Sequence, residues 1–326
     1  MYLIDGKNAS KIEDLTFADI KMIEDNIEEI LRQNIDMVCD EEESMLLVGQ
    51  QVTNRVQARS DLIAVDQDGN LVLIELKRDK KDIEHRKEAL EFQAIRYAAS
   101  CATIQTTNEL IQNVFVPYVE KHREEFGYDE LSSNEVARRL LEAFLETNHV
   151  VKFNERQKII LVASEFDEQT MSAVAWLNSN QVDIRCCRLI PSKIDDRLLL
   201  TPQKVLPVTD YEDFYIGIKE KSSFGKSSNR SISRRALPTI KSLLEWDVVK
   251  AGDTIAAKGR TEEAVLRSDG KVDTPNGELS LQQWLKAVFG WSSVATYDFA
   301  VQKSSGKTLS ELRQSYMEKI ALEKEE

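Results

Sequence analysis

Three charged residues stand in a stretch of sequence that otherwise has the composition of buried strands. Residues 58–79 read ARSDLIAVDQDGNLVLIELKRD, in which two apolar runs flank a turn and contain Asp61, Glu75 and Lys77. Charged groups within a core strand are costly unless they are paired or bind a metal. Two carboxylates and an amine together could hold a divalent cation and orient a water molecule. These residues are therefore the first candidates for chemistry.

The turn between the two runs predicts how the strands pair. Asp66-Gln67-Asp68-Gly69 suits a type I turn in which Gly69 takes the left-handed conformation, as in three-residue hairpin loops. Counting outward from this turn places Asp61 opposite Glu75, with Lys77 on the same face at the same end. The pairs expected nearer the turn are Val65 with Leu71 and Ile63 with Leu73.

The opposite face of this hairpin is wholly apolar, which predicts a central position in a sheet that is buried on both sides. Directly opposed, Asp61 and Glu75 would repel unless something positive lies between them. A divalent cation with Lys77 beside it satisfies this requirement, and the Leu76 carbonyl could complete the metal ligands. Lys77 would also orient the attacking water and favour its hydroxide form. The arrangement suits metal-assisted phosphodiester hydrolysis.

The same residues resemble a known family. The string RSDLIAVDQDGNLVLIELKR resembles the PD-(D/E)xK nuclease superfamily and, within it, the archaeal and bacterial NucS-like endonuclease domains. Asp61 matches the first acidic residue of the motif, and Glu75-Leu76-Lys77 matches its E-x-K. The resemblance covers roughly residues 18–207. It implies Mg²⁺, with Mn²⁺ as an alternative, and a DNA substrate.

The resemblance also implies site residues on the neighbouring helices. The family has an acidic residue on the helix before the motif, where Glu28 is the best match and Glu29 is an alternative. It has a Gln and a Tyr on the helix after the motif, which Gln93 and Tyr97 supply. These two residues are four apart and therefore lie on one helical face.

The sequence departs from the family pattern in two places. A helical region is inserted at about residues 105–150, and Ala58-Arg59-Ser60 stands where relatives often have Gly-Arg-Ile. The insertion leaves the substrate class open, whereas Asp61, Glu75 and Lys77 are all present.

Apolar periodicity predicts the elements that position these residues. We expect helices over 17–35, 81–100, 108–121, 134–147 and 168–180, and strands over 46–56, 61–66, 71–77, 158–164, 182–190 and, for a short one, within RLLLTPQKVLP. Ser132 and Glu135 form a capping box before one helix. The predicted fold class is α/β. The family resemblance implies that it is a PD-(D/E)xK restriction-endonuclease-like core, with a mixed central sheet flanked by helices.

A second, smaller domain of α+β class is expected at the C-terminus. Hairpin signals lie at Asp269-Gly270 and Asn276-Gly277, Ser280 is a plausible N-cap of a helix over 281–289, and a terminal helix is predicted over 308–323. The strings GDTIAAKG, LRSDGKV, NGELS and FGWSSVATYDFAV lie within residues 240–302. They faintly resemble the RAMA domain, which accompanies restriction enzymes and adenine methylases and is thought to read modified DNA, although LSLQQW replaces the usual Ser-Ser-Pro-Ser stretch. The expected domains are therefore 1–207, a basic linker over 208–236, and 237–326. We expect Trp284, Trp291, Tyr297 and Phe299 to form core rather than a base-stacking cage.

Charge and composition limit the possible partners. With 42% hydrophobic and 30% charged residues the chain is an ordinary globular protein, and its net charge of −13 argues against broad, charge-driven nucleic-acid binding. The stretch 219–241 is nevertheless basic, as either a solvated linker or a DNA contact. The candidates for contacting nucleic acid are Arg59, Arg78, Lys226, Arg230, Arg234 and Arg235.

The remaining features favour a cytoplasmic protein. The sequence contains no long apolar run and no signal-peptide pattern, so neither a membrane partner nor export is expected. Its four cysteines and three histidines show no metal-ligand spacing, and the cysteines are interpreted as reduced thiols.

The sequence thus predicts an Mg²⁺-dependent DNA endonuclease that acts on modified or foreign DNA in restriction and defence. Two alternatives stay open: a non-catalytic nucleic-acid-binding protein that keeps the nuclease fold, and a repair nuclease acting on branched or mismatched DNA. A homodimer, formed through the terminal helix, is one means of cutting two strands.

Overall fold

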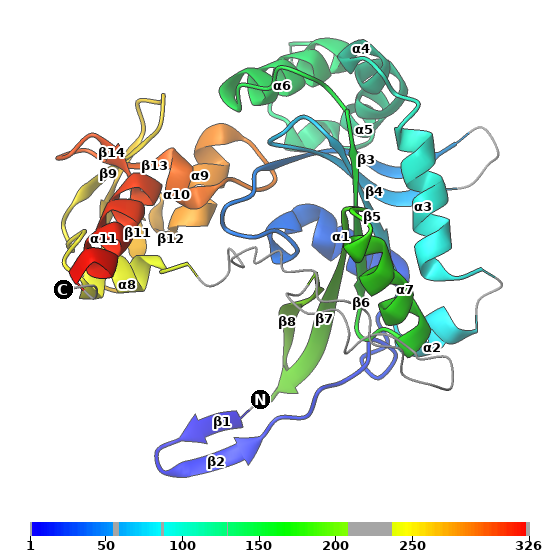
Figure 1. Cartoon of the computed structure of the whole chain (residues 1–326), viewed down its shortest axis with the longest axis horizontal. Helices are drawn as coiled ribbons and strands as arrows, with labels where there is room; N and C mark the ends of the chain where they lie inside the picture. The colour runs from blue at the N-terminus through cyan, green and yellow to red at the C-terminus, as the bar shows by residue number, and fades with distance from the viewer. Residues whose placement is uncertain (1, 55–58, 86–87, 129, 208–236, 324–326) are drawn as a thin grey trace. The chain divides into compact units, whose positions relative to one another are not determined.

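The computed structural model describes residues 2–54, 59–85, 88–128, 130–207 and 237–323 (Figure 1). These residues divide into two compact units. The first takes in the described residues up to Val38 and those from Leu46 to residue 207, and the second takes in Cys39–Met45 and the described residues from 237 onward. The expected linker over 208–236, with Lys226, Arg230, Arg234 and Arg235, lies outside the described residues.

The first unit is built on a six-stranded mixed sheet. In chain order its strands are β3 (Met45–Thr53), β4 (Arg59–Asp66), β5 (Leu71–Leu76), β6 (Gln157–Ala163), β7 (Ile184–Ile194) and β8 (Arg197–Leu206). They neighbour one another in that same order. The hairpin β4–β5 is antiparallel, β5, β6 and β7 are mutually parallel, and β8 returns antiparallel to β7. The mixed central sheet expected from the sequence is confirmed, and β4 and β5 lie inside it.

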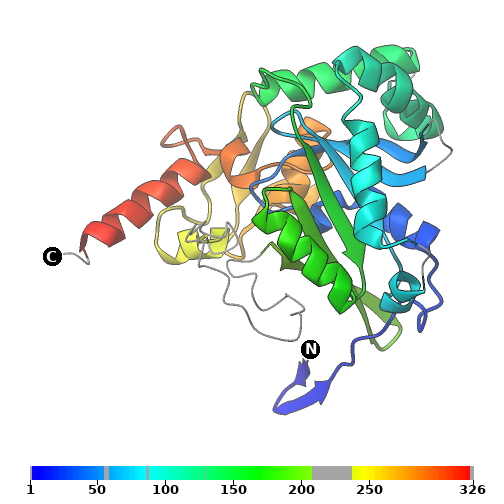
Figure 2. The same ribbon diagram turned by 45° about the vertical axis from the view of Figure 1, so that its right-hand side comes forward.

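In the described part of the first unit, four α-helices lie outside the inserted region. They are α1 (Glu24–Gln33), α2 (Lys80–Glu84), α3 (Leu90–Cys101) and α7 (Glu168–Ser179). The α3 helix packs on β5 and β6, α7 packs on β7, and α1 contacts β4. Figures 1 and 2 show α3 and α7 side by side along the sheet. Helices α1 and α3 and the hairpin strands β4 and β5 are thus the elements that position the candidate residues.

The inserted region between α3 and β6 is helical, as expected. It contains α4 (Thr107–Leu110), a π-helical turn over Ile111–Phe115, α5 (Val116–Lys121), a short 3₁₀ turn over Arg123–Glu125, and α6 (Ser133–Thr147). The π-helical turn ends two residues before Pro117, whose missing amide hydrogen removes one helical hydrogen bond. The Ser132–Glu135 capping box predicted for α6 is confirmed, since Ser132 N donates to Glu135 Oε2 over 2.8 Å.

Some predicted boundaries are wrong for local reasons. The helix expected from residue 17 begins only at Glu24, because Lys21 adopts a left-handed φ of 56° that a helix cannot contain. The single helix expected over 81–100 is two helices, α2 and α3. The strand β8 is long rather than short. The antiparallel hairpin of β1 (Tyr2–Asp5) and β2 (Asn8–Lys11), which projects from the first unit in both views, was not predicted.

The second unit is of α+β class, as expected, with an antiparallel six-stranded sheet in the order β12-β11-β10-β9-β13-β14. Its strands are β9 (Thr254–Ala257), β10 (Glu263–Leu266), β11 (Lys271–Thr274), β12 (Gly277–Ser280), β13 (Ala300–Gln302) and β14 (Lys307–Thr308). Its helices are α8 (Ile240–Glu245), α9 (Leu281–Phe289), α10 (Thr296–Phe299) and α11 (Leu309–Glu323). Both hairpin turns and the Ser280 N-cap are confirmed.

Aromatic side chains form much of the core of this second unit. Trp284, Trp291, Tyr297 and Phe299 are all buried. The Phe299 ring meets the Trp291 ring edge to face, with centroids 5.3 Å apart. The expectation that these aromatics form core rather than a base-stacking cage is confirmed.

The segment Cys39–Met45 belongs to this second unit although it precedes β3 in the chain. Thr296 N donates to the Glu41 carbonyl over 2.8 Å, and Ala295 N donates to Ser44 Oγ over 2.9 Å. Glu42 pairs with Arg313 of α11 over 2.9 Å, and both side chains are nearly buried. Sequence analysis placed this segment wholly within the first domain.

We expect Gly69→Ala to destabilise the first unit strongly. A Cβ at Gly69, where φ is +81°, would lie 2.4 Å from Val150 Cγ1 and 3.1 Å from the Lys152 carbonyl oxygen. The left-handed backbone and the overpacking together should cost about 2–4 kcal/mol, measured by urea unfolding. Gly127→Ala is the control, because Gly127 has φ +62° but its Cβ would contact nothing. Equal losses in the two variants would contradict a role for the contact with Val150.

Candidate functional site

The hairpin register predicted from the turn is confirmed from the Val65–Leu71 pair to the Leu62–Ile74 pair, and Asp61 and Glu75 follow directly beyond it. Ile63 pairs with Leu73 and Val65 with Leu71. Gly69 N donates to the Asp66 carbonyl over 2.9 Å, which closes the turn. Beyond the last regular pair, Leu76 N donates to Asp61 Oδ2 over 2.7 Å, so the Asp61 carboxylate takes the place of a backbone acceptor on β4. This bond fixes the Asp61 side chain beside the end of β5.

The Lys77 ammonium lies among three carboxylates. Its Nζ is 3.3 Å from Glu75 Oε1, 3.6 Å from Glu24 Oε2 and 3.9 Å from Asp61 Oδ2, and it also donates to the Leu76 carbonyl. The Lys77 side chain is only 3% exposed and that of Glu75 only 1%. At such separations, and with so little water, the attraction between these charges is much stronger than at the surface. The structure therefore brings Asp61, Glu75 and Lys77 together at one end of the hairpin.

The two residues predicted on the following helix reach the same place. Gln93 on α3 donates through Nε2 to Glu75 Oε1 over 2.7 Å. The same Nε2 lies 3.2 Å from the hydroxyl oxygen of Tyr97, one helical turn further along. Glu75 Oε1 is thus held between the Gln93 amide and the Lys77 ammonium, which orients the carboxylate.

Glu28 on α1 is the fourth predicted acid, and it is buried, with 4% exposure. Burial, and then the neighbouring charge of Asp61, raise the pKa of Glu28 above its usual range. Gln51 Nε2 donates to Glu28 Oε2 over 3.4 Å, whereas Glu28 Oε1 has no hydrogen-bond partner among the described residues. Burial also raises the pKa of Asp61, although Lys77 and the Leu76 amide oppose the rise. The charge of Asp61, whose side chain is 16% exposed, thus acts on the buried carboxyl group of Glu28.

The alternative acid, Glu29, has a different environment. Both of its oxygens accept hydrogen bonds from the Arg32 guanidinium, at 2.6 and 2.8 Å. These bonds lower the pKa of Glu29 to about 2. Glu29 is thus committed to an ion pair, and Glu28 is the one whose pKa responds to Asp61.

Glu24 belongs to the site but was not selected from the sequence. Its Oε2 contacts Lys77, and its Oε1 accepts a hydrogen bond from the Arg78 amide over 3.4 Å. It precedes Glu28 by four residues, so both lie on one face of α1. That spacing is the signal that could have identified it.

The two predicted basic residues of this region have separate environments. Arg59 is exposed at the start of β4, and its charge opposes the rise in the pKa of Asp61. Arg78 pairs with Asp82 over 3.0 Å and lies 3.6 Å from Asp79. Arg59 is therefore open to solvent beside the acids, whereas Arg78 is partly neutralised.

The oxygen atoms at the end of the hairpin suit a small, hard cation. In the part of the chain that the structure describes, no group of three or more His, Cys, Asp or Glu side chains is arranged to hold a metal ion. Mg²⁺ needs fewer, since it keeps several waters and commonly binds one or two carboxylates. Asp61, Glu75 and the Leu76 carbonyl provide two carboxylates and one carbonyl oxygen, all in contact with one cationic group, Lys77. The unsatisfied Glu28 Oε1 is a further acceptor.

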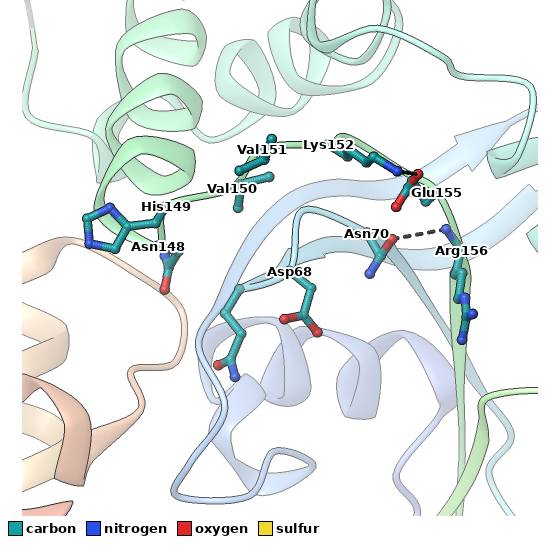
Figure 3. Close-up of a pocket in the computed structure, with 10 residues that line it drawn as sticks. Asp68, Asn70, Asn148, His149, Val150, Val151, Lys152, Glu155 and Arg156 are labelled. Atoms are coloured by element: carbon teal, nitrogen blue, oxygen red, sulfur yellow. Dashed lines mark hydrogen bonds and ion pairs between the residues drawn. The ribbon is translucent and has the colours of Figure 1, made fainter. Parts of the chain in front are cut away.

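A surface pocket of about 500 Å³ lies at the other end of the hairpin (Figure 3). It is lined by the turn residues Asp68 and Asn70 and by the segment 148–156. Asn70 Oδ1 accepts a hydrogen bond from Arg156 N over 3.0 Å. Strand β5 separates this pocket from Glu75 by about 17 Å, at about 3.3 Å per residue. The pocket is therefore distinct from the candidate site.

Comparisons with known proteins leave the family open. The chain matches no protein-family model, and no curated protein matches it significantly. No helix in the described ranges is both long enough and apolar enough to cross a membrane.

We expect Glu28→Gln to stabilise the protein at pH 7 by roughly 0.5–2 kcal/mol, because it removes a buried charge that Asp61 repels. Since the folded-state pKa of Glu28 is raised, the ionised carboxylate costs stability above that pKa and the gain should vanish as the pH falls through it. Urea unfolding at several pH values measures the effect. Glu29→Gln is the matched control and should lose stability, because it breaks the pair with Arg32. A stability loss in both variants would argue against repulsion at Glu28.

Proposed function

We propose that the first unit is an Mg²⁺-dependent endonuclease that hydrolyses phosphodiester bonds in DNA. The observation that supports this most is the Lys77 ammonium, which lies within 4 Å of the Asp61 and Glu75 carboxylates at the end of a buried hairpin. The Gln93 amide, which orients Glu75, adds a further element of the PD-(D/E)xK resemblance. An ordinary surface E-x-K pattern would have neither the burial nor these partners.

Each residue has a role in this proposal. Asp61, Glu75 and the Leu76 carbonyl would hold the ion, which when bound stabilises the charge that develops on the phosphate and the leaving oxygen. Lys77 would orient the attacking water and, through its charge, favour loss of the water proton. Glu28 Oε1 would accept a hydrogen bond from water in the site. The attacking water gives up one proton to bulk solvent, its oxygen attacks phosphorus, the bond to the leaving sugar oxygen breaks, and that oxygen takes up a proton from another water molecule.

The substrate we propose is duplex DNA that is modified or foreign, as in restriction and defence. This part depends on the faint RAMA resemblance of residues 240–302. The buried state of Trp291 and Phe299 argues that any such reading uses groups other than these rings.

Cleavage assays with Lys77→Ala test the proposed chemistry. We expect Mg²⁺- or Mn²⁺-dependent cutting of DNA by the wild type and a loss of at least about 10²-fold in the variant. The substrates should include unmodified, methylated and hydroxymethylated duplexes together with flap and mismatch DNA, so that the preferred one separates defence from repair. Lys80→Ala is the matched control, since Lys80 lies on α2 and its one ion pair among the described residues is with Glu165, at the distance limit of 4.0 Å.

Two results would overturn the proposal. If Lys77→Ala cuts as fast as the wild type, Lys77 has no part in the chemistry. If both proteins bind DNA equally and neither cuts it with either metal, a non-catalytic reader is the better description.

Gln93→Ala tests the orientation of Glu75. Without the 2.7 Å bond to Oε1, the carboxylate should rotate more freely, and the apparent affinity for Mg²⁺ should fall about 10-fold. The measurement is cleavage rate as a function of Mg²⁺ concentration, with the maximal rate less affected than the midpoint. Phe92→Ala, an exposed neighbour on α3, should leave the midpoint unchanged. An unchanged midpoint in Gln93→Ala would show that Gln93 does not orient Glu75.

A further inference from the structure

We infer that Arg32 is a positioning residue for Glu28, and that the inserted helices act through it as a brace on α1. This inference rests on the proposed function, because the position of Glu28 matters only if the acids at the end of the hairpin bind a cation. The inference gives a role to the inserted helical region, for which the family resemblance implies none.

Glu28 needs a brace because it is a buried acid that faces another acid. It is 4% exposed, its Oε1 has no hydrogen-bond partner among the described residues, and the charge of Asp61 disfavours its ionised form. Glu24, one turn earlier, is instead tied to the hairpin, since its Oε2 lies 3.6 Å from Lys77 Nζ. Repulsion in a buried setting would move α1 away from β4 unless a stronger contact opposed it. The bond from Gln51 Nε2 to Glu28 is long, at 3.4 Å. Glu24 ties the first turn of the helix to Lys77, and a further restraint on Glu28 lies one turn beyond it.

Arg32 provides that restraint. It follows Glu28 by four residues, or about 6 Å along the helix, and lies on the same face. Its guanidinium is almost fully buried and binds both oxygens of Glu29 and both oxygens of Glu125, the latter at 2.7 and 2.9 Å. It also donates to the hydroxyl of Tyr118 over 3.1 Å. A planar guanidinium with two forked partners fixes orientation as well as distance.

The same network reaches the sheet through β3. Gln50 Nε2 lies 3.4 Å from Glu29 Oε2, and Gln50 Oε1 accepts from Lys121 Nζ over 2.8 Å and lies 2.9 Å from His122 Nε2. Adjacent strand residues normally point to opposite faces, yet Gln50 and Gln51 both contact α1. The left-handed φ of 54° at Gln51 breaks the alternation, as at a β-bulge. Helices α5 and α1 and strand β3 are therefore tied together next to Glu28.

The test uses the full-length chain and the substitution Glu125→Gln. Arg32→Ala would leave several acids without their partner and could unfold the protein, whereas Glu125 is half exposed and its amide keeps the size of the side chain. Arg32→Lys is the second variant, since it keeps the charge but loses the forked bonds. Glu142→Gln is the matched control, because Glu142 pairs with Arg138 on the exposed side of α6.

Binding of Mn²⁺ to the uncut protein, measured by calorimetry, is the first readout. We expect both brace variants to bind about tenfold more weakly than the wild type and the Glu142→Gln control. In proteins that already carry Glu28→Gln, the same variants should change the affinity less than twofold. A loss of affinity that is the same with and without Glu28 would overturn the inference.

The second readout needs no metal and separates this inference from the proposed function. Glu28→Gln should raise the urea midpoint in the wild type, and this rise should be at least halved in the Glu125→Gln background, because an unbraced α1 can move away from Asp61. If the rise is the same in both backgrounds, Arg32 does not position Glu28 and the inference fails, whatever the metal result. Suppose instead that the rise in urea midpoint is halved in the Glu125→Gln background while the wild type binds no Mn²⁺. Then Arg32 does position Glu28, and the proposed metal chemistry fails.

Discussion

The candidate site depends on one ammonium group that is surrounded by carboxylates in a nearly dry environment. Asp61 and Glu75 project from neighbouring strands at the same end of the hairpin, and without a cation their charges would favour protonation or separation of the strands. Lys77 contacts both, together with Glu24 and the Leu76 carbonyl. The amine is therefore the counter-ion that allows several acids to stay close, and any metal that binds these oxygens must share them with it.

This constraint explains why the site is placed on the sheet and not on a loop. Acids that repel must be held by elements that resist movement, and β4 and β5 are interior strands covered on both faces. The Leu76 amide fixes Asp61, and Gln93 fixes Glu75 from α3. The weaker point is α1, which is not part of the sheet and brings two acids of its own. Its ties to the inserted helices compensate for that weakness.

Local chemistry explains which features could be predicted from the sequence. The register of β4–β5 followed from Gly69 and a turn of defined length, and the Ser132 cap followed from its Glu135 partner, because each depends on residues close in the chain. The late start of α1 depends on the backbone angle of Lys21, which no side-chain pattern indicates. Arg32 and Glu125 pair although they are 93 residues apart in the chain. Arg32 also binds Glu29 rather than Glu28, and this leaves Glu28 as the acid that faces Asp61. Such long-range pairing has no signal in a single sequence.

The division of the chain into two units also depends on contacts between residues that are distant in the sequence. Composition placed a boundary only after residue 207, yet Cys39–Met45 supplies backbone acceptors to Ser293 and Thr296 and an acid to Arg313 of α11. A short segment that gives its hydrogen bonds to a distant part of the chain has the same polar composition as a solvent-exposed loop, so periodicity cannot distinguish the two. This segment lies in the chain between α1 and β3, the elements that carry Glu28 and Gln51, although it belongs to the second unit. A domain defined by its contacts is therefore not the same as a domain defined by a continuous range of residues. Removal of residues from 237 onward would take Arg313 from Glu42 and the Ala295 amide from Ser44.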